Sequence, residues 1–269
     1  MKAAQSSLIV EFVNEIRDEN QAIGSEKLWL MYNQKIGTQY QIGRDAFYKI
    51  LKQNNLTLRK PRKGCRTTDS SHTLTLHKNL IKNSPLTQSN HVWVSDITYI
   101  HLLDRFCYLS LITDAYNRKI IGAYVGETLT AKDTLLALKQ TINKFSADEL
   151  SHVIHHSDRG VQYASSNYVA ELKMHGIRIS MTESGDPKDN AIAERVNGIL
   201  KKEFLNRYEF QTIQEVRDAV KSAVDFYNNK RPHRSLDMMT PEQASAKTGF
   251  IRKRWISYKD KYINESNIL

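Results

Sequence analysis

The order of apolar segments between residues 91 and 229 constrains the fold of this chain more than any other feature of its sequence. Three segments rich in Val, Ile, Tyr and Thr come first, separated by short polar turns: HVWVSDITYIHL, RFCYLSLITDAY and RKIIGAYVGETL. This pattern predicts an antiparallel meander of three strands. The elements expected after it are a helix at 131–145, a buried strand at HVIHHSD, a helix at 165–175, a strand at RISMTES, and long helices at 189–207 and 212–229.

Three adjacent strands followed by helix, strand, helix, strand and helix is the element order of the RNase H-like fold. The sequence therefore predicts an α/β domain of this class. No apolar run approaches the roughly 18 residues that a membrane span needs, which favours a protein of the cytoplasm that makes no membrane contact.

The first sixty residues are expected to form short helices. One apolar face follows the i, i+3, i+4 spacing over Leu8–Ile16, and a second helix is expected from Ser25. After the turn-like IGTQYQIG, a third helix carries basic residues on the side away from its apolar positions: Arg44, Lys49 and Lys52. Helix, turn and basic helix is the order of a helix-turn-helix reader of DNA, although any small helical bundle shows it too.

Composition divides the chain into four parts. We predict a helical DNA-binding domain at 1–64, a polar linker at 65–88, the α/β core with its C-terminal helices at 89–248, and a basic tail at 249–269. The formal net charge of +10 is spread unevenly, with about +7 over residues 1–88, −2 over 89–200 and +5 over 201–269.

An acidic centre between basic flanks suits an enzyme that acts on nucleic acid. Cations are needed to hold phosphates, and carboxylates are needed to hold catalytic metal ions. The densest basic stretch includes four residues that we expect at the DNA: Arg59, Lys60, Arg62 and Lys63. A solvated face joined to a linker is the alternative explanation for this stretch.

Three acids occupy special places in the predicted core. Asp96 interrupts the apolar pattern of the first strand, Asp158 ends the fourth strand, and Glu194 lies early in a helix. Each has a structural explanation by itself, as a backbone acceptor, a turn former or a helix-dipole partner. Together they make a stronger candidate: 35 residues lie between Asp158 and Glu194, and Lys201 follows Glu194 by seven residues. In an α-helix, that last spacing places Glu194 and Lys201 on one face.

Four motifs in this order resemble the orfB-type transposases of the third insertion-sequence family, whose catalytic core is like that of retroviral integrases. They are WVSDITYI, HHSDRGVQYAS, GDPKDNAIAERVNGILKKEF and FYNNKRPHRSL. The resemblance covers about 90–248, and IGRDAFYKILKQNNLTLRKPRK matches more loosely. It implies a catalytic and metal-binding triad of Asp96, Asp158 and Glu194, with Lys201 as a downstream basic residue at the DNA.

The resemblance also implies roles for residues around the triad. The positions expected to shape the site are Gln162, Tyr163, Asp189 and Asn190. In the C-terminal motif, Arg231 and Arg234 are expected at the DNA backbone, although a packing role for this segment is equally open. His155 and His156 adjoin Asp158, but without further ligands at zinc spacing we expect them to be structural.

Carboxylate oxygens without thiols select Mg²⁺ or Mn²⁺ over zinc, and two such ions about 3.5–4 Å apart can clamp an in-line displacement at phosphorus. The expected reaction is cleavage that exposes a 3′-OH at the element's end, followed by attack of that hydroxyl on a second phosphodiester. The expected partner is double-stranded DNA, both the terminal repeats of the element and the target. The resemblance further implies a homo-multimer on paired ends, an upstream orfA-type product or fusion, and a bacterial cytoplasmic protein found at the nucleoid when bound to DNA.

Two alternatives come from other functional classes. One is a DNA-binding regulator of transposition that occupies element ends and is catalytically silent without a fusion partner. The other is an RNase H-like nuclease that cuts but never joins. The intact triad disfavours the first, and the basic N-terminal region together with Lys201 disfavours the second.

Overall fold

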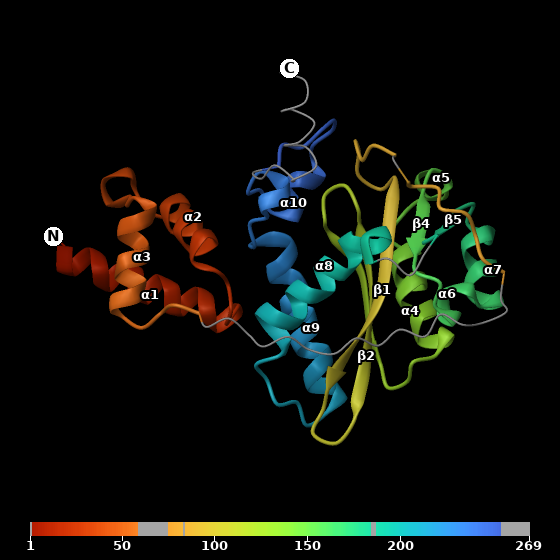
Figure 1. Ribbon diagram of the computed structural model, residues 1–269, viewed down its shortest axis with the longest axis horizontal. Coiled ribbons are helices and arrows are strands. Elements are labelled where there is room, and N and C mark those ends of the chain that lie inside the picture. Colours follow the sequence, from red (N-terminus) through yellow and green to blue (C-terminus); the bar gives the residue numbers. More distant parts are fainter. Residues whose placement is uncertain (1, 59–74, 83, 184–186, 254–269) are drawn as a thin grey trace, which may run out of the picture.

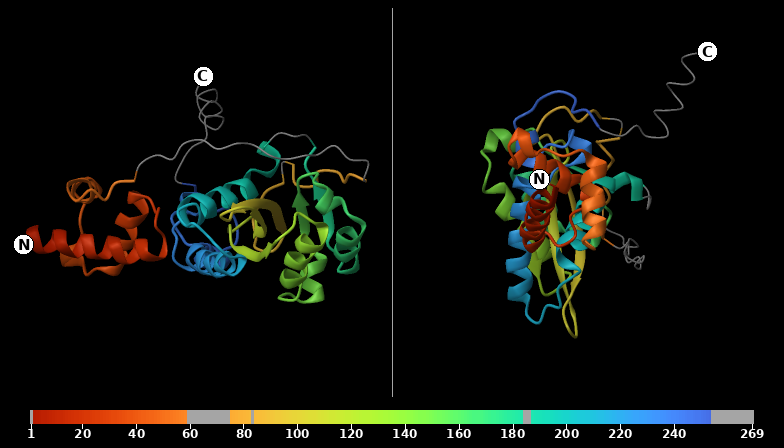
Figure 2. Two further views of the ribbon diagram at one scale, coloured as in Figure 1. Left: turned by 90° about the horizontal axis from the view of Figure 1, so that it is seen from below. Right: turned by 90° about the vertical axis from the view of Figure 1, so that its left-hand side faces the viewer.

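The computed structural model describes residues 2–58, 75–82, 84–183 and 187–253. A unit of three helices occupies one end of the molecule, and a larger unit built on a five-stranded sheet occupies the other (Figure 1). A view from below again places the helical unit beside the sheet unit (Figure 2). The predicted fold class, an α/β core preceded by a small all-α region, is confirmed.

The sheet has the strand order β3-β2-β1-β4-β5. The antiparallel meander that the sequence predicts consists of β1 (Val92–His101), β2 (Phe106–Asp114) and β3 (Ile120–Gly126). On the other side of β1, β4 (Ile154–Ser157) and β5 (Arg178–Met181) run parallel to it. Parallel neighbours need crossover connections, and helices supply them here. As a result β1 is the central strand.

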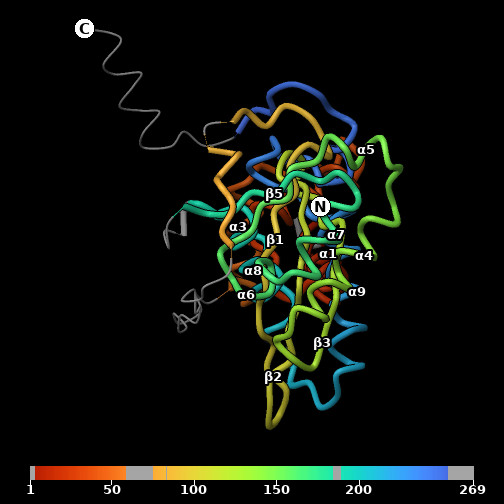
Figure 3. Tube along the Cα trace, turned by 90° about the vertical axis from the view of Figure 1, so that its right-hand side faces the viewer, coloured from red at the N-terminus to blue at the C-terminus, as the bar shows by residue number. Residues whose placement is uncertain are grey.

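One face of the sheet is covered by α4 (Ala131–Ile142), α6 (Val161–Ala164) and α7 (Ser166–Met174), and α5 (Ala147–Ser151) leads into β4. Figure 3 shows α4 and α7 together on one side of β1, with α8 on the other. Trp93 of β1 is fully buried in this layer. The glycine at position 122 lets α4 approach the sheet closely, because a Cβ there would lie 1.9 Å from Thr141 Oγ1.

The opposite face packs against α8 (Ala191–Ile199) and the segments that follow it. The short helix η2 (Pro187–Asn190) precedes α8, and the π-helix η3 (Leu200–Leu205) continues it. The single long helix predicted at 189–207 is therefore three pieces of different winding. Next come α9 (Ile213–Asn229), η4 (Arg234–Leu236) and α10 (Pro241–Ser245).

The N-terminal unit consists of α1 (Lys2–Glu19), α2 (Ser25–Lys35), the short η1 (Thr38–Tyr40) and α3 (Arg44–Gln53). Three aromatic rings form its centre, with Tyr32 packed 5.5 Å from Phe12 and 5.8 Å from Phe47 between ring centroids. The apolar cluster of this unit continues into η3 and α9 of the core. The predicted succession of helix, turn and basic helix is confirmed by α2, η1 and α3.

Part of the predicted linker lies along the sheet unit. The Leu80 amide donates to Ser180 Oγ in β5 at 2.9 Å, and Thr87 accepts from the Gly249 amide at 2.7 Å. Residues 65–74 and 83 lie outside the described residues, and the domain boundaries at 64, 88 and 248 stay predictions. Within the described ranges, no helix has the length and apolar character that crossing a membrane requires.

Candidate active site

The pairing of β1 with β4 brings two of the three predicted acids together. The parallel register pairs Val94 with His156, two residues before Asp96 and Asp158 respectively. Since side chains alternate along strands, both acids stand at adjacent positions on the sheet face that packs against α8. Asp96 lies within β1, and Asp158 follows the last residue of β4. The carboxyl end of the short strand β4 is thus where the two carboxylates gather.

Asp96 is held from two directions. Its Oδ1 accepts from the Ile97 amide at 2.9 Å, and its Oδ2 accepts from Asn197 Nδ2 at 2.7 Å. Burial raises the pKa of Asp96 to about 7, and the charge of Asp158, with a smaller effect of Glu194, adds to the rise despite these two bonds. The three acids are therefore close enough to repel one another, and bound cations would relieve that repulsion.

Asp158 is shaped by the turn that follows it. The Gly160 amide donates to Asp158 Oδ1 at 2.9 Å. A Cβ on Gly160 would lie 3.0 Å from that oxygen and 3.1 Å from Gln162 Oε1, so the turn has little room for a side chain. Gln162 is buried and its Nε2 donates to the Leu129 carbonyl at 3.1 Å. These contacts support the predicted role of Gln162 in shaping the site.

Two buried amides fasten α8 to β1: Asn190, the residue before the helix, and Asn197 within it. Asn190 Nδ2 donates to the Ser95 carbonyl at 2.9 Å, and Asn197 makes the bond to Asp96 described above. Ala193 is buried between them against the sheet, and the next residue, Glu194, is exposed. The third acid thus sits on a helix whose rotation relative to β1 is set by Asn190 and Asn197.

His156 links η2, the short helix before α8, to the sheet. Its Nδ1 lies 2.8 Å from Ser180 Oγ in β5, and its Nε2 lies 3.0 Å from the Asp189 carbonyl in η2. His155 points to the other face, where its Nε2 lies 2.7 Å from Ser95 Oγ and 3.0 Å from the Tyr168 hydroxyl. Burial lowers the pKa of His155 to about 3, which keeps it neutral. These contacts support the structural role expected of both histidines.

Tyr163 is fully buried in the apolar layer behind the acids. Its ring centroid lies 5.4 Å from that of Tyr168, edge to face. Burial raises the pKa of its hydroxyl well above the usual value, with further contributions from Tyr168, Asp96 and Asp158. It therefore stays protonated and supports the site from within the core.

The three acids differ in exposure and do not form a ready-made metal site. In the part of the chain that the structure describes, no group of three or more His, Cys, Asp or Glu side chains stands at metal-ligand spacing. Glu194 is exposed on α8, while Asp96 and Asp158 are half-buried at the strands.

Lys201 does not continue the α-helical face of Glu194, because α8 ends at Ile199 and Lys201 lies in the π-helix η3. Its Nζ stands 3.9 Å from the centroid of the Tyr99 ring in β1. Burial lowers the pKa of Lys201 from its usual value. Lys201 thus contacts the strand that carries Asp96, at Tyr99, which is three residues after Asp96 in β1.

The other predicted DNA contacts fall into three groups. Arg44, Lys49 and Lys52 of α3 are exposed, as a DNA-facing role requires. Arg59, Lys60, Arg62 and Lys63 lie outside the described residues. Arg234 is exposed and stands 3.4 Å from Glu26 of α2.

Arg231 is the exception, since it does not face solvent. Its side chain is 3% exposed and binds Glu203 through two nitrogens, Nε at 2.8 Å and Nη2 at 2.5 Å. Lys27 of α2 stands 3.6 Å from the same carboxylate. This burial contradicts the expected DNA-backbone contact of Arg231, and the packing role left open for its segment is the one that Arg231 has.

Sequence reasoning missed two residues that hold the site, Asn197 and His156 in its positioning role. The signal for Asn197 was present, because an amide three residues after Glu194 on an α-helix lies near the same face. The signal for His156 was its position two residues before Asp158 on a buried strand.

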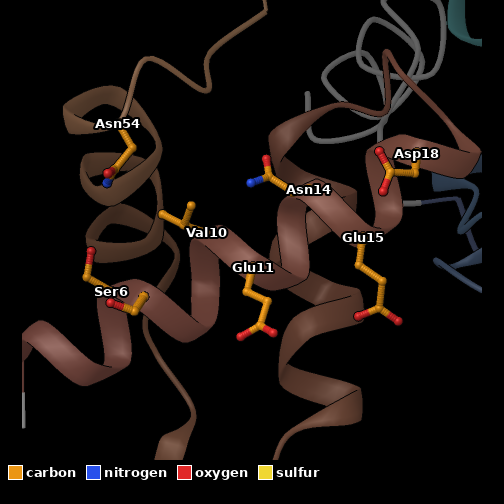
Figure 4. A pocket seen from close by; sticks show the side chains of 8 residues that line it. Ser6, Val10, Glu11, Asn14, Glu15, Asp18 and Asn54 are labelled. Atoms are coloured by element: carbon orange, nitrogen blue, oxygen red, sulfur yellow. The ribbon is translucent and has the colours of Figure 1, made fainter.

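A second group of acids belongs to the N-terminal unit and is separate from the triad. Figure 4 shows a hollow whose lining comes from α1 and from Asn54 just after α3, with Glu11, Glu15 and Asp18 projecting from α1. Glu15 is paired with Lys35 at 2.9 Å. This acidic surface contrasts with the exposed basic side chains of α3 in the same unit.

Comparison with known proteins shows which family the chain belongs to. Two family models, both described as integrase core domain, match residues 87–187 and 175–241. An insertion element IS600 uncharacterized 31 kDa protein of Shigella sonnei is 34% identical over 202 residues, which is 74% of each chain. The chain belongs to the insertion-sequence transposases with an integrase-like core. Its function is DNA transposition, and polynucleotidyl transfer is the activity class of this family.

Further relatives cover more of this transposase. The putative transposase for insertion sequence element IS986/IS6110 of Mycobacterium tuberculosis (strain H37Rv) is 29% identical over 243 residues, 88% of this chain and 86% of that one. Among solved structures, the simian T-cell lymphotropic virus intasome in complex with PP2A regulatory subunit B56 gamma matches with a TM-score of 0.51 at 18% identity. That match covers 88% of this chain and 75% of the viral one, and it shows a shared fold.

Proposed function

We propose that this transposase cleaves the phosphodiesters at the ends of its element and transfers the resulting 3′-OH to target DNA, with Asp96, Asp158 and Glu194 as the metal-binding catalytic residues. The observation that carries the proposal is the register of β1 and β4. It places two carboxylates from distant parts of the sequence on one sheet face, beneath the helix that carries the third.

The donor set fits divalent metal ions of the Mg²⁺ or Mn²⁺ type. Asp96 and Asp158 offer hard oxygen ligands. The charge of Asp158 helps to raise the pKa of Asp96, and repulsion between neighbouring carboxylates favours the binding of cations between them. Two ions held by the three carboxylates would activate the attacking oxygen and stabilise the leaving 3′ oxygen.

The surrounding residues have defined tasks in this scheme. Asn197 donates to one oxygen of Asp96 and leaves the orientation of that carboxylate fixed. The Gly160 amide does the same for Asp158. Lys201, held above β1, supplies a positive charge for a DNA phosphate close to the acids. Water and then the 3′-OH would attack in line at this one site.

DNA binding extends beyond the acids. The exposed basic side chains of α3 and the basic stretch at 59–63 are the proposed contacts of the N-terminal unit with double-stranded DNA, both element ends and target. Joining two ends requires that both be present at once, so we propose a homo-multimer on paired ends, with an upstream orfA-type product or fusion as a further partner.

The test is a cleavage-and-joining assay on labelled DNA that carries the genomic sequence flanking the gene, with Mg²⁺ or Mn²⁺ present. Wild type should expose 3′ ends and join strands, whereas Asp96→Asn, Asp158→Asn and Glu194→Gln should lose both steps and keep DNA binding. Glu183→Gln is the matched control, because Glu183 lies just after β5 and pairs with Lys82 at the surface.

Each other outcome has a meaning. Cleavage without joining would identify a nuclease instead of a transposase. Binding without either step, in the chain alone and in a fusion to the upstream product, would identify a regulator. Strand joining that survives in Glu194→Gln would refute the assignment of the triad.

A further inference from the structure

Lys201 is a half-buried cation held by an aromatic ring. Its Nζ lies 3.9 Å from the centroid of the Tyr99 ring. Among the described residues, no carboxylate pairs with Lys201 within 4 Å, although the chain forms many such pairs elsewhere. A ring face attracts an ammonium group through its quadrupole and leaves the full positive charge in place.

Tyr99 is itself fixed in the sheet. It lies in β1, three residues after Asp96, and its ring packs edge to face against Phe106 of β2 at 5.3 Å. Its partner across the antiparallel ladder is Tyr108. β1 pairs with β4 only up to Val94, so β4 does not cover β1 at the position of Tyr99. η3 can therefore reach this part of β1 with a long side chain.

We propose that Tyr99 is a positioning residue that holds the Lys201 ammonium group against β1, ready to bind a phosphate of the element end. This proposal rests on the proposed function, because it assumes that Lys201 contacts DNA. A carboxylate in place of the ring would neutralise the ammonium group and compete with phosphate. The ring orients the cation without doing either, and the N–H groups of Lys201 stay available to the DNA.

The proposal predicts a specific set of affinities for a short labelled duplex carrying the element end. Lys201→Met should weaken binding and reduce the slope of log K against log [salt] by about one phosphate contact. Tyr99→Leu should weaken binding about 2- to 30-fold, the range expected of a cation–π pair. Tyr99→Phe keeps the ring face and should restore wild-type affinity to within about twofold.

Two further arms separate positioning from general packing. Tyr108→Leu, the matched control on the same sheet face, should leave affinity unchanged. In the Lys201→Met background, Tyr99→Leu should have no further effect, because the residue that it positions is already absent. The thermal midpoint of each variant shows whether it is folded, and Tyr99→Phe preserves the test if Tyr99→Leu is not.

The failures are distinguishable. If Lys201→Met weakens binding while Tyr99→Leu, folded as wild type, does not, the role of Tyr99 is refuted and the proposed function stands. Additive effects of the two substitutions refute it in the same way. If Lys201→Met binds as wild type does, the DNA contact of Lys201 fails, and the role of Tyr99 fails with it.

Discussion

Removing the Glu203 carboxylate is expected to destabilise the protein by about 3–5 kcal/mol, the cost of leaving a buried charge without its partner. Glu203 lies in η3, and its side chain is 15% exposed. Without it, the buried Arg231 guanidinium loses two charge-assisted hydrogen bonds and remains near Lys27, a like charge. The Ala22 amide also donates to the Glu203 carbonyl, so this residue joins the N-terminal unit to the core.

The assay is urea unfolding of Glu203→Ala, followed by circular dichroism, with thermal unfolding as a second measure. For a chain of this size the expected loss lowers the thermal midpoint by about 10 °C. Glu15→Ala is the control, since Glu15 and Lys35 form a pair whose side chains are each 59% exposed, and such pairs contribute about 0–1 kcal/mol.

The double variant Glu203→Met/Arg231→Met separates the cost of an unpaired charge from the loss of packing. It removes both charges and should recover most of the stability, because apolar residues replace a buried ion pair at little net cost. A loss in Glu203→Ala no larger than in Glu15→Ala would refute the reasoning. A double variant as unstable as Glu203→Ala would show that packing, not charge, is responsible.

Three further predictions concern other parts of the molecule. Gly122→Ala should lower the thermal midpoint, because the added methyl group would clash with α4. Gly198→Ala in α8 has open space around the new methyl group and should raise the free energy of unfolding by about 0.5–1 kcal/mol. Equal effects of the two substitutions would contradict this prediction. Asn197→Ala should lower strand-joining activity about 10- to 100-fold with unchanged folding, by releasing the Asp96 carboxylate. Burial, with the charge of Arg231, lowers the pKa of Lys27 to about 8, so the unfolded chain holds a proton that the folded chain releases between about pH 8 and 10.4. Stability measured by urea should therefore gain a contribution that rises with pH across that window, and Lys27→Met should remove this contribution.

Much of the fold follows from local pattern. The three strands of the meander, the two later strands and the helices on both sides could be predicted because each buries one face against a common core, and burial imposes a period on the residues. The π-helix could not be predicted in this way. Residues 200–205 continue an apolar pattern that is also compatible with an α-helix, and their winding is a property of the packed segment.

The candidate site also has a part that the sequence predicts and a part that only the packed structure shows. Asp96, Asp158 and Glu194 could be named as candidates from the sequence because together they match the motifs of a known family in order and spacing, although each alone has a structural explanation. Their meeting depends on the parallel pairing of β1 with β4, which joins residues about sixty positions apart. Asn197 was not named because its bond to Asp96 exists only after α8 packs on the sheet.

Arg231 shows the limit most clearly. In the sequence it is one cation in a basic region, and cations are exposed unless a partner is buried with them. The partner is Glu203, 28 residues earlier, and the N-terminal unit closes over both. The sequence by itself determined the order of elements, the chemical class of the acids and the family, because these depend on local pattern and motif. Only the tertiary structure decided which charged side chains are exposed and which are buried, because that depends on which distant residues pack together.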